Sequence, residues 1–328
     1  MDRSVVFNPR RWEPEASSIR FNQDASVGVH HSGDTEDTTG DGSPRDSYRK
    51  NKGFRMKYIK FAALGLVAAS SSAFAASGTD QPDGAQAASN TAAAQQDVNS
   101  FELSTGFDYS VGKYGAAVDT TVWDVPVEAK AQLGRLRLQA SLPYVWIKGP
   151  GQIVGGVVVG STNPGAVAER NGIGDLTVAG AFRLTDDRGA LPMIEVGGNV
   201  KFPTADQTIG TGKTDYGVNV AVYKSFGQQV TLFGSVGYSW LGSPAAYQLK
   251  DGITAYGGLN LRPDQAINLG ASVSYREPVA AGLSGQAVVS PYMTWRFSNN
   301  FGLTAYGLAG LNDASPRIGA GLRLTLFQ

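Results

Sequence analysis

The sequence predicts an all-β fold: a transmembrane, antiparallel, up-and-down β-barrel of about 12 strands in residues 101–328. Three observations predict it. The region divides into segments of roughly ten residues that alternate apolar and polar side chains, and Gly, Pro, Asn or Asp ends each segment. Short connections alternate with mostly longer ones, and an export signal precedes the region. Because alternation alone also fits a soluble sandwich, the export signal favours the barrel.

Each strand is placed where one side-chain parity is apolar. In the clearest segment, Ile267, Leu269 and Val273 fall on one face, while Asn268 and Ser272 fall on the other. The same pattern predicts strands at 101–111, 119–133, 136–147, 173–185, 191–203, 214–226, 230–241, 252–262, 266–277, 286–297, 301–311 and 317–328. Since this number is even, both ends of the barrel are expected on the periplasmic side.

The connections indicate which end of the barrel faces outward. The short ones, expected as periplasmic turns, are 134–135, 186–190, 227–229, 263–265 and 298–300. The outer loops are expected at 148–172, 204–213, 242–251 and 278–285. The loop at 148–172 is the longest and contains several glycines and a run of valines. The sequence leaves open whether this loop folds over the pore, folds into it or is mobile.

Aromatic side chains gather near both ends of the expected strands. Those toward the outer rim are Tyr144, Trp146, Phe202, Tyr238, Trp240 and Tyr275. Those toward the periplasmic rim are Phe101, Phe182, Phe226, Trp295, Phe297 and Phe301. Amphipathic rings prefer the level of the lipid headgroups, so two such belts predict outer-membrane lipid as a partner. Phe327, next to the last residue, falls outside the apolar parity of the final strand.

The region before the barrel predicts export. Residues 56–75 form a secretion signal peptide, with Lys57 and Lys60 before an apolar stretch and with cleavage expected after Ala75. Residues 1–55 are a polar extension, interpreted as a misassigned start or a disordered leader. Residues 76–100 are expected as a flexible periplasmic tail, with a short helix that plugs the barrel as the alternative. The expected location is the outer membrane of a Gram-negative bacterium, reached through the outer-membrane assembly machinery.

Composition excludes several classes of function. Residues 76–328 hold 17 Lys and Arg against 19 Asp and Glu, a net charge near −2 that gives no reason to expect a nucleic-acid partner. The chain has no Cys, and its two histidines, His30 and His31, lie before the signal peptide. Thiol catalysis, His-dependent catalysis and His metal ligation are therefore not expected. We expect no enzyme activity, no catalytic residue, no cofactor and no metal site.

The inward parity of the strands collects ionisable side chains. They are Glu102, Asp108, Asp124, Glu128, Lys130, Arg137, Asp175, Arg183, Glu195, Lys201, Asp215, Arg296 and Arg323. One interpretation is an ion-pair network that fills and rigidifies the lumen, and the other is a narrow conduit whose charge preference these residues set. Arg137, Glu195, Lys201 and Arg296 are the representative lumen-lining candidates. Lys224 breaks the parity, at a strand end from which its long side chain can reach the headgroups.

For hydrophobic solutes the candidate lumen-lining residues are the inward aromatics Phe233, Tyr256, Tyr292 and Tyr306. They either contact the solute or fill a narrow lumen. Gly234 and Gly237 lie on opposite faces of one strand, where glycine is destabilising unless a bend or a close approach needs it. These two glycines predict a kink or a lateral opening.

The segment Gly210-Thr-Gly-Lys-Thr214 is similar to the end of a phosphate-binding P-loop. The motif requires a Gly where this chain has Gln207, and no apolar helix follows. The segment is therefore interpreted as an outer loop in which glycines permit tight turns.

Several segments go beyond general barrel patterning. They are Val125-Pro126, Leu142-Pro143-Tyr144, Gly172-Ile-Gly-Asp-Leu176, Lys201-Phe-Pro-Thr-Ala-Asp206 and Gly210-Thr-Gly-Lys-Thr-Asp-Tyr-Gly217. With them, residues 101–328 resemble the outer-membrane proteins of the phenol meta-degradation pathway family, which are often labelled transporters. The resemblance implies a small outer-membrane barrel that passes aromatic or other hydrophobic compounds, and it assigns no catalytic residue. The loop at 148–172 and the Phe-Gln ending have no counterpart in the resemblance.

Three functions are consistent with these observations. The first is an outer-membrane channel for passive uptake of small molecules, aromatic or hydrophobic compounds among them. The alternative is a closed structural or adhesion barrel that acts through its outer loops. A lipid-modifying barrel enzyme is the third, although such enzymes typically activate Ser with His, which residues 76–328 do not contain.

Overall fold

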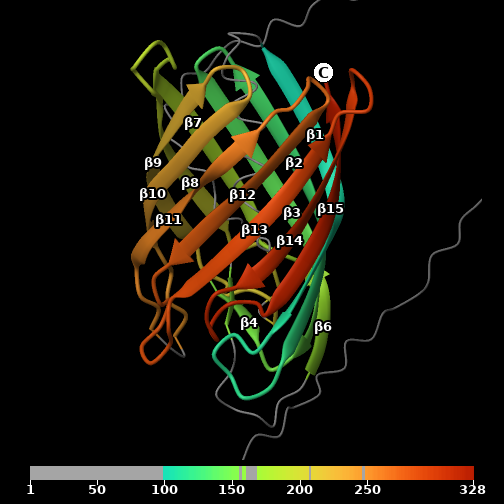
Figure 1. Cartoon of the computed structure of the whole chain (residues 1–328). Helices are drawn as coiled ribbons and strands as arrows, with labels where there is room; N and C mark the ends of the chain where they lie inside the picture. Colours follow the sequence, from blue (N-terminus) through green and yellow to red (C-terminus); the bar gives the residue numbers. More distant parts are fainter. Residues whose placement is uncertain (1–98, 155–156, 160–167, 207, 246–247) are drawn as a thin grey trace, which may run out of the picture. The chain divides into compact units, whose positions relative to one another are not determined.

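The computed structural model describes residues 99–154, 157–159, 168–206, 208–245 and 248–328 (Figure 1). The expected polar extension at 1–55, signal peptide at 56–75 and all but the last residues of the tail at 76–100 lie outside the described residues. Within the described part, no helix is long and apolar enough to cross a membrane.

The described residues form fifteen strands. They are β1 (Ser100–Gly112), β2 (Thr120–Leu133), β3 (Leu136–Gly149), β4 (Gln152–Val154), β5 (Val157–Val159), β6 (Ala168–Ile173), β7 (Leu176–Thr185), β8 (Met193–Phe202), β9 (Asp215–Phe226), β10 (Val230–Trp240), β11 (Gly252–Leu261), β12 (Ile267–Arg276), β13 (Gln286–Trp295), β14 (Phe301–Gly310) and β15 (Ile318–Phe327).

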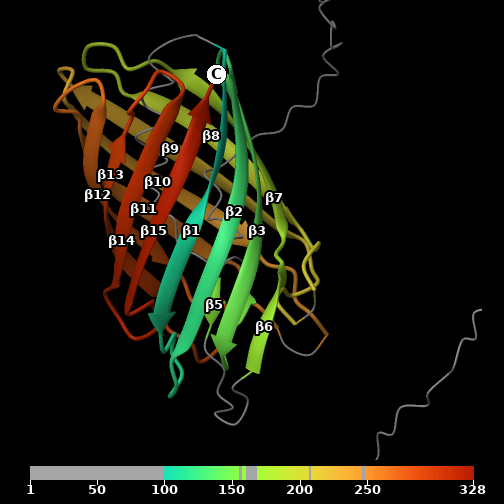
Figure 2. The ribbon, with the colours of Figure 1, turned by 90° about the vertical axis from the view of Figure 1, so that its right-hand side faces the viewer.

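Twelve of these strands close into an antiparallel barrel, which confirms the predicted fold class (Figures 1 and 2). Each barrel strand pairs with its neighbours in the chain, from β1, β2 and β3 through β7 to β15. The barrel closes where β1 pairs with β15, from Glu102 opposite Phe327 to Val111 opposite Ile318. Because no barrel strand has a free edge, all backbone groups in the wall can pair within the protein, as a lipid environment requires.

The predicted strand at 173–185 is divided in the structure. β6 pairs with residues 144–149 of β3, and β7 pairs with residues 136–141 of the same strand. Residues 174–175 separate β6 from β7. Gly174 donates its backbone N–H to the Pro143 carbonyl oxygen over 2.8 Å, and a Cβ at this position would lie 2.7 Å from the Pro143 ring. The sequence does not reveal the interruption, because Asp175 fits the inward polar parity of the predicted strand and Gly174 fits either face.

The alternation of the wall separates lipid-facing from lumen-facing side chains. Along β15, Ile318, Leu322 and Leu324 are exposed on the outer surface, whereas Arg323 is buried on the inner one. This apolar-out, polar-in arrangement is typical of transmembrane barrels and is the reverse of a soluble core. Tyr144 and Trp146, and also Tyr238 and Trp240, form contacting aromatic pairs on the outer surface, with ring centroids 4.5 and 5.1 Å apart.

The two ends of the barrel differ as the lengths of the connections predict. The C-terminus and the start of β1 lie at one end, which we call the terminal end, and the short turns lie at the same end (Figure 1). Gly134 occupies the two-residue turn between β2 and β3 with a φ of 60°, a left-handed conformation that glycine adopts at low cost. The longer connections lie at the opposite end, the loop end, together with β4, β5 and β6.

The glycines of β10 do not mark a lateral opening. β10 pairs with β9 from Val230 to Trp240 and with β11 from Val230 to Ser239, in one unbroken register on each side. Gly237 instead allows a close approach, because an added Cβ would lie 2.8 Å from the Val218 carbonyl oxygen.

The register between β13 and β14 omits Pro291, which has no N–H to donate to the ladder.

Lys224, which breaks the inward parity, has a partner within the barrel. Its ammonium pairs with Asp187 in the turn between β7 and β8 and donates to the Gly189 carbonyl oxygen over 2.7 Å. The Ser225 backbone N–H also donates to Asp187, over 2.7 Å. Burial opposes ionisation of Asp187, but these hydrogen bonds outweigh it and lower the carboxyl pKa. Lys224 therefore fastens a turn of the terminal end to the wall.

Candidate functional site in the barrel lumen

The lumen has two halves of different chemistry. The strands β15, β1, β2, β3, β7, β8 and β9, which we call the charged half, carry the buried ionisable groups of the wall. The strands β10 to β14, the uncharged half, contain one charged residue, Arg276, at the loop end of β12. The inner surface of the uncharged half is made mostly of aromatic, hydroxyl, amide and glycine residues, with Val288, Leu308 and Arg276 toward the loop end. Because the sheet order places β9 beside β10 and β14 beside β15, each half is continuous.

Lys201 forms the centre of an ion-pair cluster toward the loop end. Its ammonium lies 2.9 Å from Asp175 and 2.9 Å from Asp215, and all three side chains are buried. The two carboxylates also accept backbone N–H groups, Asp175 from Ala205 over 3.0 Å and Asp215 from Gly242 over 2.8 Å. Three segments that carry the family resemblance thus meet at one cluster, which ties the loops after β8 and β10 to the wall.

A second cluster lies at the seam of the barrel, in the charged half beside its border with β14. Arg323 on β15 pairs with Asp108 on β1 and with Glu128 on β2, each over 2.7 Å. Asp124 lies directly opposite Asp108 in the pairing of β1 with β2. The Tyr306 hydroxyl of the uncharged half donates to Asp108. Arg323 thus pairs with two carboxylates and a third, Asp124, lies opposite one of them, so this cluster carries an excess of acidic groups.

Arg137 on β3 and Glu195 on β8 form a third buried ionic contact in the charged half, on the two strands that flank β7. The guanidinium of Arg137 lies 2.9 Å from the Glu195 carboxylate, and both side chains are less than one-tenth exposed. Tyr223 and Tyr256 are close enough to this guanidinium to interact with it electrostatically. Tyr256 packs against Phe233 with ring centroids 6.3 Å apart, and Met193 and Ala221 complete an apolar cluster there.

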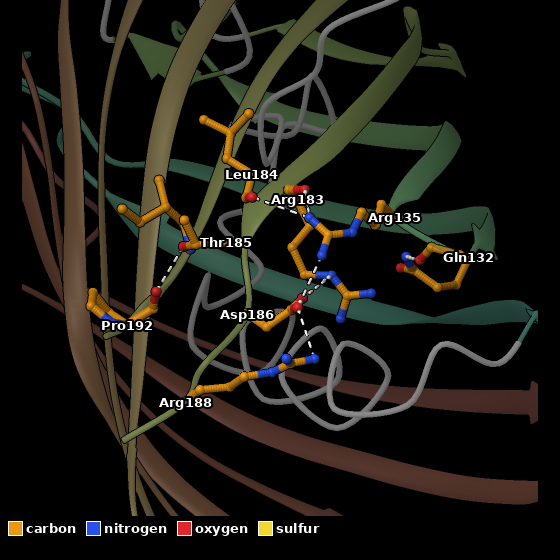
Figure 3. Close-up of polar contacts among 10 residues, drawn as sticks. Gln132, Arg135, Arg183, Leu184, Thr185, Asp186, Arg188 and Pro192 are labelled. Carbon is orange, nitrogen blue, oxygen red and sulfur yellow. Dashed lines mark hydrogen bonds and ion pairs between the residues drawn. The ribbon is translucent and has the colours of Figure 1, made fainter. Parts of the chain in front are cut away.

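Arginines also gather at the terminal end, around Asp186 (Figure 3). Asp186 forms ion pairs with Arg135 over 2.9 Å, with Arg188 over 3.3 Å and with Arg183 over 3.4 Å. Arg183 is buried in the wall, whereas the Arg188 side chain is 81 % exposed at the rim. With Arg137 and Glu195 nearby on the same strands, four arginines face two carboxylates. The terminal end of β3, β7 and β8 therefore has a positive excess.

The inward aromatics lie over glycines of the neighbouring strand. Tyr292 is paired with Gly270 and Tyr306 with Gly321, and an added Cβ at either glycine would collide with the tyrosine ring. Phe233 is paired with Gly258 in the same way, its Cζ 2.7 Å from the position of the missing Cβ. The rings therefore rest against the wall. The glycines explain how a narrow barrel holds large rings on its inner surface.

A hairpin of β4 and β5 lies in the mouth at the loop end. On one side Ile153 and Val158 pack with Val145 and Ile147 of β3. On the other side Val154 and Val157 pack with Leu241 and Val279, which belong to two different loops. The Gln286 amide nitrogen of β13 donates to the Val158 carbonyl oxygen over 2.8 Å. The β4 and β5 parts of the loop at 148–172 are therefore folded into the mouth, whereas residues 168–172 pair with β3.

A cavity of about 20 Å³ remains beside this hairpin, which is room for about one water molecule. It is lined by Val157 and Val159 of the hairpin, by Leu283 of the loop after β12, and by Arg276 and Gln286 of the wall. In the described residues, no group of three or more carboxylate or imidazole side chains is arranged to hold a metal ion.

The predicted lumen-lining residues occupy different places. Arg137, Glu195, Lys201, Phe233, Tyr256, Tyr292 and Tyr306 are buried inside the barrel. Arg296 lies just beyond β13 at the terminal end, where it is exposed and its guanidinium stacks 4.0 Å above the Phe327 ring. The structure brings Arg137 together with Glu195, and Phe233 with Tyr256, whereas Lys201 and Tyr306 belong to separate clusters.

Three features of the lumen were not singled out by sequence reasoning. Arg323 and Tyr223 fit the inward parity but carry no signal of their own that ranks them above other inward residues. The hairpin of β4 and β5 is signalled by the run of valines, whose partners lie in distant loops. The glycines under the aromatic rings become visible only when the strand register is known.

No curated protein sequence matches the chain. Among solved structures, an outer membrane channel from Pseudomonas putida F1 is similar in fold, with a TM-score of 0.52 and 14 % identity over 70 % of this chain and 94 % of that one. The monoaromatic hydrocarbon channel CymD matches with a TM-score of 0.42 and 12 % identity, covering 80 % and 98 %. The KdgM porin matches with a TM-score of 0.45 and 8 % identity, covering 69 % and 98 %.

A protein-family model matches residues 76–326, which span almost the whole barrel and most of the chain. Its description is "Putative MetA-pathway of phenol degradation". The match confirms the family that the segments around Asp175, Lys201 and Asp215 resemble. The chain belongs to this family of outer-membrane-type β-barrels.

Proposed function

We propose that the protein is a passive channel in the outer membrane of a Gram-negative bacterium, and that it admits small molecules, including aromatic compounds. The single observation that carries the proposal is the two-sided lumen. An uncharged wall with inward-facing aromatic rings faces a wall of paired ionisable groups. A solute with a flat apolar part and a polar part finds contacts for both along the same path, which neither a purely ionic nor a purely apolar lumen provides.

Transport through this lumen is diffusion down a gradient. The rings that lie over glycines present flat surfaces on which an aromatic solute stacks weakly, with each such contact worth about 0.5–1.5 kcal/mol. Weak contacts at several positions favour entry without trapping the solute. The β4–β5 hairpin narrows the mouth and sets an upper limit on solute size. The loop end faces outward in this proposal, because outer-membrane barrels keep short turns on the periplasmic side.

The test is solute entry into liposomes that contain the full chain, purified from an outer-membrane fraction and checked for heat-modifiable migration as a sign of folding. Benzoate is the main solute because, being charged, it crosses bare lipid slowly; a sugar and acetate are compared with it. Entry faster than into barrel-free vesicles is expected. A folded barrel that admits none of the three solutes contradicts the proposal.

A closed barrel that acts through its outer loops is the second candidate, and the burial of the β4–β5 hairpin in the mouth is the observation that favours it. The same liposomes separate the two functions, since a closed barrel admits no solute even after the hairpin is deleted. The third candidate, a lipid-modifying enzyme, predicts release of fatty acid or lysolipid from these vesicles. We propose that none is released.

A further inference from the structure

The cluster around Arg137 joins a buried guanidinium to an aromatic wall. Arg137 lies on β3, and its side chain is only 7 % exposed. The Glu195 carboxylate forms an ion pair with Nη2 over 2.9 Å, whereas Nη1 has no acceptor with hydrogen-bond geometry in the described part of the chain. The Tyr223 hydroxyl lies near the guanidinium but does not add a negative charge. Glu195 is the one carboxylate paired with this guanidinium in the described residues, so a second anionic acceptor at Nη1 is favourable.

The charge around Arg137 also favours an added anion. Arg183 lies on the adjacent strand, directly opposite Glu195 in the pairing of β7 with β8. Asp186, which pairs with Arg183, also forms ion pairs with Arg135 and Arg188. The two carboxylates therefore balance only part of the positive charge of the four arginines. A single additional carboxylate reduces the excess.

The apolar side of the cluster is formed by two packed aromatic rings with apolar neighbours. Phe233 and Tyr256 pack at 52° to each other with Met193 and Ala221 beside them. Phe233 lies over Gly258, so its ring is held against the wall rather than across the lumen. A flat ring placed on these side chains brings a substituent toward the guanidinium, because Tyr256 interacts with both Phe233 and Arg137.

We propose that Arg137, with the ring surface of Phe233 and Tyr256, is a binding site for small aromatic carboxylates inside the channel. The carboxylate accepts from Arg137 Nη1, and the ring lies on the aromatic pair. This inference rests on the proposed channel function and names a preferred class of solute for it: planar and aromatic, with a single negative charge. Arg137 and Glu195 form a pair in which Glu195 competes with the solute for the guanidinium.

The experiment measures block of the KCl current through the full-length protein in planar bilayers. The probes are benzoate, acetate, which has the charge without the ring, and benzyltrimethylammonium, which has the ring with the opposite charge. In the unmodified protein, benzoate is expected to block at a concentration about tenfold lower than either control probe, because acetate lacks the ring contact and benzyltrimethylammonium lacks the charge-assisted hydrogen bond. Equal block by benzoate and acetate overturns the proposal.

Two variants shift the benzoate block in opposite directions. In R137Q/E195Q both charges are removed while the size of the side chains is nearly kept, and the half-blocking concentration of benzoate is expected to rise about tenfold. In E195Q the guanidinium loses its competitor, and the half-blocking concentration is expected to fall several-fold. A pair with only a structural role moves neither value. The matched control is K130Q/E102Q, which neutralises another lumen ion pair, of 2.7 Å, at the same end of the barrel.

A third variant tests the ring surface. In F233L the apolar character is kept but the ring is lost, so the benzoate block is expected to weaken while the acetate block stays unchanged. An unmodified protein that carries no current at all refutes the channel function. A protein that conducts, but whose benzoate block is the same in R137Q/E195Q, refutes only the aromatic-carboxylate site.

Discussion

Gln286 on the barrel wall donates its side-chain amide to the Val158 carbonyl oxygen of the β4–β5 hairpin over 2.8 Å, and to the Ala314 carbonyl oxygen over the same distance. One side chain therefore joins the hairpin in the mouth to β13 and to the loop between β14 and β15. The hairpin is otherwise held by apolar contacts on its two sides. The hydrogen bonds of Gln286 therefore fix the orientation of the β4–β5 hairpin as well as its depth in the mouth of the barrel.

Removal of this link is expected to loosen the hairpin. In Gln286→Ala both hydrogen bonds are lost, each worth about 0.5–1.5 kcal/mol, while the strand pairing of β13 is kept. The mean conductance in planar bilayers is expected to rise and the current to fluctuate between levels. Asn312→Ala is the control, because Asn312 bonds the Gly285 carbonyl oxygen over 2.9 Å and does not contact the hairpin by a hydrogen bond. Identical currents in the two variants contradict a restraining role for Gln286.

Loss of the Lys201 charge is expected to destabilise the barrel. Lys201→Met leaves Asp175 and Asp215 buried without their shared cation, and breaking a buried pair in this way costs about 3–5 kcal/mol. The temperature at which the folded band disappears in heat-modifiable migration measures the loss. Lys213→Met removes an exposed lysine from the loop between β8 and β9 and is expected to change this temperature little. Equal midpoints for the two variants refute the role of the cluster.

The contact between rings and glycines predicts a steric effect. Gly270→Ala places a methyl group against the Tyr292 ring, and overpacking of this kind costs about 1–3 kcal/mol. Unfolding in urea should show the loss, and the second substitution Tyr292→Leu should recover part of it. Gly234→Ala is the control, since its added Cβ meets only the Tyr256 carbonyl oxygen at 3.5 Å, an ordinary contact. If both alanine variants unfold alike, the rings are not held against the glycines.

Asp187 makes stability depend on pH. Its carboxyl pKa is lowered in the folded protein, so its contribution is fully present above the pKa of the unfolded chain and is lost as the pH falls through the lower folded value. Asp187→Asn is therefore expected to be less stable than the unmodified protein at pH 7, by about 1 kcal/mol because the turn is partly solvated. The difference should vanish in strong acid. A difference that is constant from pH 7 to strong acid excludes this linkage.

The strands were predictable because lipid outside and polar groups inside impose one strict alternation on each segment. The predicted bounds differ from β1, β9 and β14 by one residue or less at each end. Alternation says nothing of side chains that meet across the lumen. Lys201 joins a carboxylate of β9 to one between β6 and β7, and Arg137 reaches Glu195 from the opposite side of β7. These ion pairs depend on the register between strands and on closure of the barrel. The sequence of a single strand specifies neither.

The β4–β5 hairpin in the mouth shows a second limit of prediction from the sequence. Val154 and Val157 are apolar in a loop, and their partners Leu241 and Val279 are also loop residues far away in the chain. Each of these residues alone resembles an ordinary exposed apolar residue. Only their assembly reveals a small apolar core at the loop end, so the sequence left the conformation of this loop open.

The pairing of Arg323 with Asp108 has a consequence for how the barrel assembles. The two residues are 215 positions apart in the chain, on the strands that form the seam. Contacts of such long range form slowly, because a long stretch of chain must be ordered before they can be made. Until β15 arrives, β1 and β14 are open edges that can pair with another chain. The last strand therefore ends the period in which the protein is prone to aggregation, and Arg323 completes the seam with the same movement.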